Sequence, residues 1–289
     1  MTRIVSSLAQ ISLNYDVLFC DLWGCLHNGK QPYLAAVKAL IAYRRSGGRV
    51  VLMTNAPRPH AYVIAQLDRM GVPREAWDLV VSSGDAAQEA MFQGVVGHKV
   101  WHVGTEKDDG FFNDIPDGLA NVTPITRVSL EDAEGMVVTG PFDEMTEAPE
   151  DYRSRFVEAQ KRGLKLLCAN PDIVVDMGDQ RIYCAGALAE FYEDMGGASL
   201  YYGKPHAPIY ARAKRLLNLP DNARILVIGD GINTDVRGAA QEGLDCLFVT
   251  GGLAAEAFGP DVENPDADLL KEWLSRHLSA PKFTIGRLR

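Results

Sequence analysis

Two aspartates in this sequence each stand just after a short apolar run. Asp21 follows residues 17–20, and Asp230 follows the strand-like run 224–228 and one glycine. Apolar runs of this length predict strands that are buried on both faces of a parallel sheet. Ligands bind beyond the carboxyl ends of such strands, and carboxylates there are oxygen ligands that Mg²⁺ favours. The pair therefore predicts a Mg²⁺ site at one edge of a sheet.

Two further residues, Thr54 and Lys204, lie where such a site could use them. Thr54 follows the apolar run 49–53, and Lys204 lies in Gly203-Lys204-Pro205, just after a short predicted strand. A hydroxyl, an ammonium group and nearby backbone N–H groups can hold a phosphoryl group. Each residue alone is a weak signal, and Asp21 by itself would more often be a solvated turn residue. Together they predict a site for a metal and a phosphate.

The two outer parts of the chain alternate between predicted strands and helices. Besides the runs already named, strands are expected at 78–82, 199–202 and 246–249, and helices at 32–45, 61–70, 187–195 and 208–217. A helix is also expected near Thr234, and Ser83 or Asp85 could cap the helix after 78–82. This alternation is typical of an α/β protein with a doubly wound, Rossmann-type parallel sheet. Right-handed crossovers would place Asp21 and Thr54 at the same edge of that sheet.

The middle of the chain reads as a separate α/β unit inserted into the first. Strands are expected at 99–103, 136–139 and 165–168, with a helix at 151–162. Residues 108–117 are rich in acids, glycine and proline, and are expected to form a surface loop. We therefore predict a core domain formed by residues 1–84 and 183–289, and an inserted domain formed by residues 85–182.

The sequence resembles the haloacid dehalogenase (HAD) superfamily, in its class IIA branch of NagD-like phosphatases with an inserted α/β cap. The resemblance spans essentially the whole chain. It rests on Asp21-Leu22-Trp23-Gly24, Thr54-Asn55, Gly203-Lys204-Pro205 and Gly229-Asp230-Gly231-Ile232-Asn233-Thr234-Asp235. Asn170-Pro171-Asp172 also resembles a motif of the caps in that branch. The resemblance implies a HAD-like hydrolase core and a cap domain that sets substrate specificity.

That resemblance implies a nucleophile and a set of metal ligands. Asp21 would attack phosphorus and become an aspartyl phosphate. Mg²⁺ would bind the Asp21 carboxylate, the backbone carbonyl of Trp23 and the Asp230 carboxylate. The physical logic agrees, because a carboxylate that attacks an anionic phosphoryl group needs cations to suppress repulsion.

The resemblance also implies how phosphate would be held. Thr54 and the Asn55 amide would bind phosphate oxygens. Lys204 would neutralise charge on both the nucleophile and the phosphoryl group. Asp235 would lie one layer further out, where it would orient Lys204 or water near the metal.

Trp23 departs from the pattern of the family. Its phosphatases carry a second aspartate two residues after the nucleophile, as a general acid for the leaving alcohol and then a base for water. The indole N–H does not titrate near neutral pH, and general acid–base help is typically worth about 10²–10⁴ in rate. The protein should therefore be slow on alkyl phosphates and less impaired on substrates with good leaving groups. His27, in a flap that turns at Asn28-Gly29, is the nearest titratable substitute, although a flap histidine is more often merely exposed.

The residues and the resemblance together predict a Mg²⁺-dependent phosphatase-like hydrolase of a small phosphorylated metabolite, such as a sugar phosphate, a nucleotide or an aryl phosphate. Because Trp23 replaces the acid, a catalytically weak or inactive phosphate-binding regulatory protein on the same fold is the alternative. Removal of halide from small acids ranks lower, since Asp230 and Asp235 would be unnecessary for it. A nucleotide-binding P-loop at 24–30 ranks lower too, because Gln31 stands where a metal-binding hydroxyl belongs. His98 and His102 have the spacing of zinc ligands only if they were helical, and they lie in a predicted strand.

Composition narrows the partners and the compartment. The formal net charge of −9 and the lack of a basic block argue against nucleic acid. The five cysteines are widely spaced inside apolar runs, which is typical of small buried residues in a reducing compartment. The sequence shows neither a secretory signal nor an apolar run long enough for a membrane span. We therefore expect a cytoplasmic protein, with a homodimer through the cap domain left open.

Overall fold

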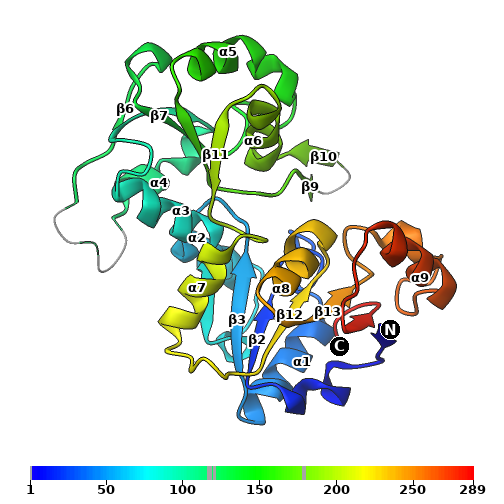
Figure 1. The fold of residues 1–289 in the computed structure, drawn as a ribbon. Coiled ribbons are helices and arrows are strands. Elements are labelled where there is room, and N and C mark those ends of the chain that lie inside the picture. The colour runs from blue at the N-terminus through cyan, green and yellow to red at the C-terminus, as the bar shows by residue number, and fades with distance from the viewer. Residues whose placement is uncertain (1, 116–118, 120–121, 178–179) are drawn as a thin grey trace. The chain divides into compact units, whose positions relative to one another are not determined.

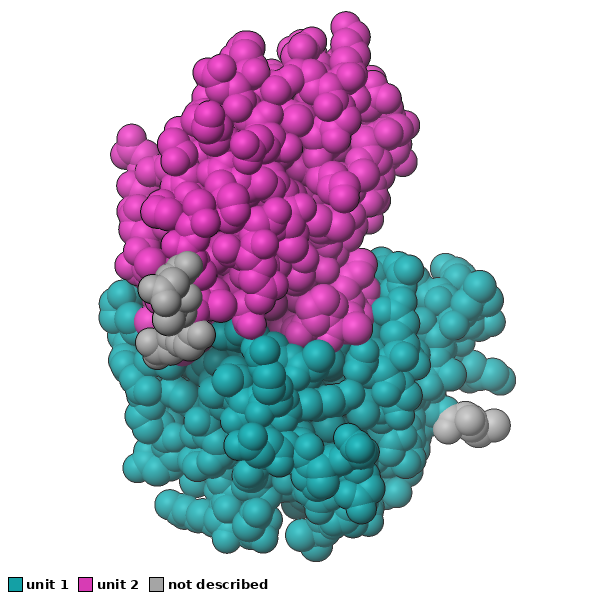
Figure 2. Space-filling view, turned by 60° about the vertical axis from the view of Figure 1, so that its left-hand side comes forward, with its two compact units in different colours: residues 1–54, 64–81, 210–289 teal, residues 55–63, 82–209 magenta. Residues whose placement is uncertain are grey.

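The computed structural model describes residues 2–115, 119, 122–177 and 180–289. The chain folds into two compact units (Figure 2). The first unit comprises Met1–Thr54, Ile64–Val81 and Tyr210–Arg289, and the second comprises Asn55–Val63 and Ser82–Ile209.

The first unit is built on a seven-stranded sheet of order β1-β14-β13-β12-β2-β3-β4. Its strands are β1 (Arg3–Ile4), β2 (Val17–Cys20), β3 (Arg49–Thr54), β4 (Leu79–Ser82), β12 (Ile225–Gly229), β13 (Asp245–Val249) and β14 (Phe283–Ile285). The neighbours β2–β3, β2–β12 and β12–β13 pair in parallel. Every residue of β2 and β12 is buried, as expected for central strands covered on both faces. The predicted α/β class with a parallel sheet is confirmed.

Helices connect these strands close to where the sequence predicts them. They are α1 (Leu34–Arg45), α2 (His60–Arg69), α7 (Ala207–Leu216), α8 (Arg237–Gln241) and α9 (Ala267–Arg276), with a π-helix at Ile232–Val236 and 3-10 turns at Leu8–Gln10, Ser12–Asn14, Arg74–Ala76 and Ala255–Phe258. The chain passes from one unit to the other within α2 and within α7. The strands β1 and β14 and the helix α9 were not predicted from the sequence.

The second unit has its own five-stranded sheet of order β11-β8-β7-β5-β6 (Figure 1). Its strands are β5 (Lys99–Val103), β6 (Thr126–Arg127), β7 (Gly135–Val138), β8 (Lys165–Cys168) and β11 (Ala198–Tyr201), and a separate antiparallel hairpin is formed by β9 (Val174–Met177) and β10 (Gln180–Tyr183). Its helices are α3 (Ser83–Phe92), α4 (Gly110–Asn113), α5 (Arg153–Lys161) and α6 (Ala185–Asp194), with 3-10 turns at Glu106–Asp108, Leu130–Asp132 and Pro149–Tyr152. One apolar cluster, which includes Tyr152, Phe156 and Tyr192, lies among β7, β8, α5 and α6.

The division into units differs from the predicted domain boundaries. Residues 55–63, 82–84 and 183–209 belong to the second unit rather than the first. The strand β11 pairs in parallel with β8, and Leu188 of α6 lies in the core of the second unit. A helix followed by a short strand fits either sheet equally well, so the pattern alone did not assign these elements. That the second unit acts as a substrate-specificity cap stays a prediction.

The prediction of a surface loop at 108–117 is wrong for residues 108–113. Asp108 is buried at the end of a 3-10 turn, and α4 follows. Phe111 and Phe112 of α4 pack into a second apolar cluster of the same unit. The acidic and glycine-rich composition masked these two aromatic residues. Residues 116 and 117 lie outside the described residues.

Local capping differs in one detail from the prediction. The N-cap of α3 is Ser82, whose hydroxyl accepts the Asp85 N–H at 3.0 Å while the Asp85 carboxylate accepts the Ser82 N–H at 3.2 Å. Asp85 therefore completes a capping box, and Ser83 is the first helical residue.

The structure also bears on the cysteines and on membrane crossing. All five cysteines are free thiols in buried positions. Among the described residues, no helix has the length and the apolar character needed to span a bilayer.

Candidate metal and phosphate site

Asp21 and Asp230 stand at the carboxyl ends of the neighbouring strands β2 and β12. The two strands pair with Cys20 opposite Ile228, and the Asp21 N–H donates to the Ile228 carbonyl at 2.8 Å. Figure 1 shows β2 and β12 side by side, although they come from distant parts of the chain. Both acids therefore leave the sheet at the same edge.

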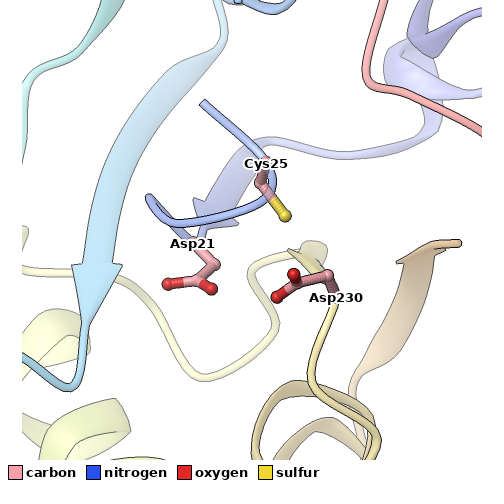
Figure 3. A group of neighbouring side chains, drawn as sticks. All are labelled: Asp21, Cys25 and Asp230. Carbon is pink, nitrogen blue, oxygen red and sulfur yellow. The ribbon is translucent and has the colours of Figure 1, made fainter. Parts of the chain in front are cut away.

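The side chains of Asp21, Cys25 and Asp230 gather at this edge. One carboxylate oxygen of each aspartate and the Cys25 Sγ all lie within 4.8 Å of one another. In Figure 3 the Asp230 carboxylate extends toward Asp21, and the Cys25 thiol points toward the Asp230 side chain. Asp21 is only 8% exposed and Cys25 only 1%. Two carboxylates at this separation repel each other unless a positive charge lies between them, so the donor set fits a divalent cation.

Two glycines and one backbone donor hold the Asp230 carboxylate in place. Gly24 has a φ of +71°, and a Cβ at this position would lie 1.9 Å from Asp230 Oδ2. A Cβ on Gly252 would lie 2.0 Å from the same oxygen. The Leu253 N–H donates to Asp230 Oδ2 at 2.8 Å. The loop after β13 was not predicted to be part of the site, although the Gly251-Gly252 pair after a predicted strand was a signal for it.

Cys25 is the second residue that sequence reasoning missed. Burial raises the pKa of its thiol well above the ordinary value, and the charges of Asp230 and Asp21 raise this pKa further. Cys25 is therefore a neutral thiol beside two acids. A thiol in the same loop as the expected nucleophile was the available signal, because cysteine sulfur is a metal ligand.

Asp235 folds back onto the loop that carries Asp230. Its Oδ2 accepts the Gly231 N–H at 3.2 Å and the Thr234 hydroxyl at 3.4 Å, and the side chain is 1% exposed. A Cβ on Gly229 would lie 2.0 Å from the Asp235 Cγ. Asp235 thus stabilises the turn after β12 through hydrogen bonds to that turn. Its predicted action on Lys204 or on water stays a prediction.

Trp23 and His27 pack together in the flap that follows Asp21. Their rings meet edge to face with centroids 5.3 Å apart. A Cβ on Gly29, where φ is +84°, would lie 2.3 Å from the Trp23 ring. The predicted turn is present, since the Asn28 side-chain oxygen accepts the Lys30 N–H at 3.0 Å. The Trp23 indole is therefore held by the flap itself.

His27 is buried rather than exposed in this flap. It is 1% exposed, and its Nδ1 accepts the Gly29 N–H at 3.0 Å. Burial lowers the pKa of His27 to about 4, so the ring is neutral near pH 7. A buried ring that is already an acceptor is poorly suited to donate a proton to a leaving group. This geometry favours a packing role over the role of substitute acid.

Thr54 ends β3, the strand next to β2. Leu52 of β3 stands opposite Cys20 of β2, so Thr54 and Asp21 both lie where neighbouring strands end. Thr54 is 3% exposed. Its placement fits the predicted role in holding phosphate, and that role stays a prediction.

The second unit holds the remaining predicted residues, Asn55 and Lys204. The Lys204 N–H donates to Asn55 Oδ1 at 2.7 Å, and Asn55 Nδ2 donates to the Lys204 carbonyl at 2.9 Å. Asn55 Nδ2 also donates to Asp172 Oδ1 at 2.8 Å. The Asp172 N–H in turn donates to Asn170 Oδ1 at 3.0 Å. The side chain of Asn55 thus positions the backbone of Lys204 and the segment that resembles a cap motif.

The two histidines with zinc-like spacing do not form a metal site in the described part of the chain. His102 lies in β5, where its Nε2 is 2.9 Å from Thr139 Oγ1 and its ring contacts Phe112. Burial lowers the pKa of His102 to about 4. The cluster of Asp21, Cys25 and Asp230 contains neither His98 nor His102.

Comparison with known proteins decides the family. The model of the family described as haloacid dehalogenase-like hydrolase matches residues 18–115, and a second model, described as HAD-hydrolase-like, matches residues 201–271. A haloacid dehalogenase-like hydrolase from Brucella suis is 38% identical, with 99% of this chain and 100% of that chain covered and a TM-score of 0.84. The chain belongs to the haloacid dehalogenase-like hydrolases. The two matched segments contain Asp21, Thr54, Lys204 and Asp230.

Several HAD-like hydrolases of known activity are similar to this chain. A D-glycerol 3-phosphate phosphatase from Mycobacterium tuberculosis is 28% identical over 85% of this chain and 66% of its own length. A glycerol phosphate phosphatase from that organism, solved in complex with magnesium, is 26% identical over 87% of this chain and 73% of that chain, with a TM-score of 0.65. A dihydroxyacetone phosphatase from Corynebacterium glutamicum is 29% identical over 38% of this chain and 43% of its own length. This chain therefore spans less than two thirds of the curated relatives that it matches.

Proposed function

We propose that this HAD-like hydrolase is a Mg²⁺-dependent phosphatase that acts on a phosphate monoester of a small metabolite. The observation that carries the proposal is the approach of Asp21 and Asp230, with ligand atoms within 4.8 Å of each other at the carboxyl edge of a parallel sheet. The similarity to glycerol phosphate and dihydroxyacetone phosphatases supports the reaction class.

Asp21 is the nucleophile in this proposal. A carboxylate oxygen of Asp21 forms a bond to phosphorus while the bond to the leaving oxygen breaks, which gives an aspartyl phosphate and an alkoxide that takes a proton from water. Water then attacks phosphorus and releases inorganic phosphate, and the Asp21 carboxylate is restored. Division of hydrolysis into two displacements is the benefit of the covalent intermediate.

Asp21, Asp230 and the Trp23 carbonyl hold the metal ion in this proposal. Bound there, Mg²⁺ supplies positive charge that lowers the repulsion between the carboxylate and the phosphoryl oxygens. The contact of Asp230 with Gly24 and with the Leu253 N–H fixes the carboxylate before the metal binds. Asp235 keeps the turn that carries Asp230 in shape.

Thr54, the Asn55 backbone N–H and Lys204 hold the phosphoryl group. Because the Asn55 side chain is already bonded to Lys204 and Asp172, we assign phosphate binding at Asn55 to its backbone rather than to its side-chain amide. Lys204 contributes the cationic charge. The hydrogen bond from the Lys204 N–H to Asn55, the residue directly after Thr54, supports a shared role for the three residues.

We infer the substrate class from the absence of a general acid at Trp23 and from the activities of similar phosphatases. Trp23 offers no titrating proton, and His27 is neutral and buried. We therefore propose turnover that is slow on alkyl phosphates and faster on esters with good leaving groups. Sugar phosphates, nucleotides and aryl phosphates are the classes to screen, with the second unit acting as the specificity cap. Similarity to a 5'-nucleotidase from Bacillus subtilis, 29% identical over 40% of this chain, supports the nucleotide class.

The packing of Trp23 also favours one alternative. The flap holds the Trp23 indole at the position where related phosphatases carry a general acid. In this alternative, the protein binds a phosphorylated ligand and hydrolyses it very slowly. A binding protein shows ligand-dependent thermal stabilisation without release of phosphate.

Hydrolysis of p-nitrophenyl phosphate separates these functions. The full chain with Mg²⁺ should release p-nitrophenol, and Asp21→Asn should abolish the release while leaving the fold intact. Asp16→Asn, at the opposite end of β2, is the matched control and should retain activity. A phosphoenzyme mass increase on Asp21 would establish the covalent step. No release by the wild-type chain, together with stabilisation by phosphorylated ligands, would favour the binding protein.

A further inference from the structure

We propose that Cys25 makes the acid pair a site for thiophilic divalent cations, of the class of Zn²⁺ and Cd²⁺, that compete with Mg²⁺. The inference rests on the proposed metal site and adds a fourth ligand to the Asp21 carboxylate, the Asp230 carboxylate and the Trp23 carbonyl. Cys25 lies in neither the phosphate-binding motifs nor the set of expected Mg²⁺ ligands. Its position adds a sulfur ligand to a site that otherwise offers only oxygen.

The geometry suits one small cation held by all three side chains. Asp21, Cys25 and Asp230 each offer a ligand atom within 4.8 Å of the other two. Around a tetrahedral Zn²⁺, with bonds of about 2.3 Å to sulfur and about 2.0–2.2 Å to oxygen, donor atoms stand roughly 3.5 Å apart. The three groups therefore need to close by only about 1 Å, which rotation of the Asp21 carboxylate and small shifts of the loop that carries Cys25 can supply.

The three ligand atoms also differ in how firmly they are placed. The Asp230 carboxylate is fixed by the Leu253 N–H and by contact with Gly24. Cys25 is 1% exposed, so its thiol has few other orientations. A preorganised pair of this kind lowers the entropic cost of binding a cation.

Ligand softness decides which cations use the thiol. Mg²⁺ prefers oxygen ligands and leaves the Cys25 thiol protonated. Zn²⁺ and Cd²⁺ favour thiolate, so their binding breaks the S–H bond, forms a metal–sulfur bond and releases one proton to water. The Cys25 thiolate and the two carboxylates then offset the two positive charges of the cation and leave one net negative charge at the site. A thiophilic ion bound in this way excludes Mg²⁺ from the Asp21 carboxylate.

Cd²⁺ is the probe that reports the sulfur directly. The metal-free full chain, titrated with Cd²⁺, should show the ultraviolet thiolate-to-Cd²⁺ charge-transfer absorption and saturate near one equivalent. Excess Mg²⁺ should suppress this absorption by competition. In Cys25→Ser the absorption should disappear, and the ratio of Cd²⁺ affinity to Mg²⁺ affinity should fall about tenfold or more.

Matched variants identify which thiol and which carboxylate take part. Cys246→Ser removes another buried thiol of the first unit, in β13, and should keep the absorption. Asp230→Asn should weaken the Cd²⁺ absorption along with Mg²⁺ binding. Cys25→Ala serves as a second variant if Cys25→Ser does not fold, with folding judged from thermal unfolding.

Each outcome bears on the inference. Loss of the absorption in Cys25→Ser and its retention in Cys246→Ser support Cys25 as the ligand. An absorption of unchanged size in Cys25→Ser, or Cd²⁺ binding by the wild-type chain without the absorption, overturns it. A wild-type chain that shows the Cys25-dependent absorption but no hydrolysis of any phosphate ester would refute the proposed function alone. Suppression by Mg²⁺ that fails in the wild-type chain would refute the shared site.

Discussion

The side chain of Asn55 and the backbone of Lys204 are joined by a reciprocal pair of hydrogen bonds. The Lys204 N–H donates to Asn55 Oδ1 at 2.7 Å, and Asn55 Nδ2 returns a bond to the Lys204 carbonyl at 2.9 Å. The other proton of Nδ2 goes to Asp172 at 2.8 Å. The amide of Asn55 thus uses its oxygen and both of its protons to hold two segments that are distant in the sequence. Both Asn55 and Lys204 are 2% exposed, so water cannot substitute for these bonds.

Asn55→Asp should destabilise the protein and lower kcat. The carboxylate cannot donate to the Lys204 carbonyl, and it repels Asp172, so unfolding should become easier by about 2–3 kcal/mol. The variant should also position Lys204 less well. Urea unfolding and phosphatase kinetics measure the two effects. Asn113→Asp, on an exposed residue of α4, is the control, and an equal loss in both variants would contradict the assignment.

Gly24→Ala should weaken Mg²⁺ binding as well as stability. The new Cβ would lie 1.9 Å from Asp230 Oδ2, and φ is +71° there. Gly71→Ala separates the two causes, because Gly71 has a φ of +74° with no atom within 4 Å of its Cβ position. Both variants should lose about 1 kcal/mol of stability from the backbone conformation. Mg²⁺-dependent thermal stabilisation should fall only in Gly24→Ala, and an equal fall in both would show that the contact with Asp230 is unimportant.

Trp23→Asp should raise activity on alkyl phosphates more than on aryl phosphates. A carboxylic acid at this position can protonate an alkoxide, and such help is worth about 10²–10⁴ in rate, whereas p-nitrophenolate leaves without it. The loss of ring contacts with His27 and Gly29 should cost about 1–3 kcal/mol of stability. The ratio of kcat/KM for glycerol 3-phosphate to that for p-nitrophenyl phosphate is the measurement. Trp23→Phe keeps an apolar ring and should leave this ratio low; a similar rise in both variants would rule out proton donation.

His102 should make the stability depend on pH. Burial lowers the pKa of His102 to about 4 in the folded protein, against about 6.5 when unfolded. The unfolded chain therefore binds more protons between these values, so stability is present above pH 6.5 and is lost as the pH falls toward 4. His102 should contribute about 2 kcal/mol to the loss between pH 7 and pH 5, measured as the difference in urea midpoint shift between the wild-type chain and His102→Gln, because buried His27 adds a similar loss to both. His102→Gln should reduce this loss, and the same variant at the exposed His277 should not.

The sequence by itself determined the strands that carry the two acids. The apolar runs before Asp21 and Asp230 favour strands, because four or five apolar residues bounded by turn residues are too few for a typical buried helix, and both runs are strands in the structure. The Asn28-Gly29 pair likewise predicted a tight turn from the sequence. The structure has Gly29 at a φ of +84°, a conformation that favours glycine. These features are local, and local sterics and burial decide them.

Only the tertiary structure decided which side chains meet. Cys25 joins the acids because the loop after β2 turns back beside Asp230, and its buried thiol looks like any small apolar residue in the sequence. The pairing of β11 with β8 was likewise invisible, because a short strand carries no mark of which sheet accepts it. The side chain of Asn55 bonds to Lys204 through contacts across a long stretch of chain, which periodicity and propensity do not encode. Local sequence thus determined the strands and turns, whereas long-range packing determined which strands pair and which side chains meet.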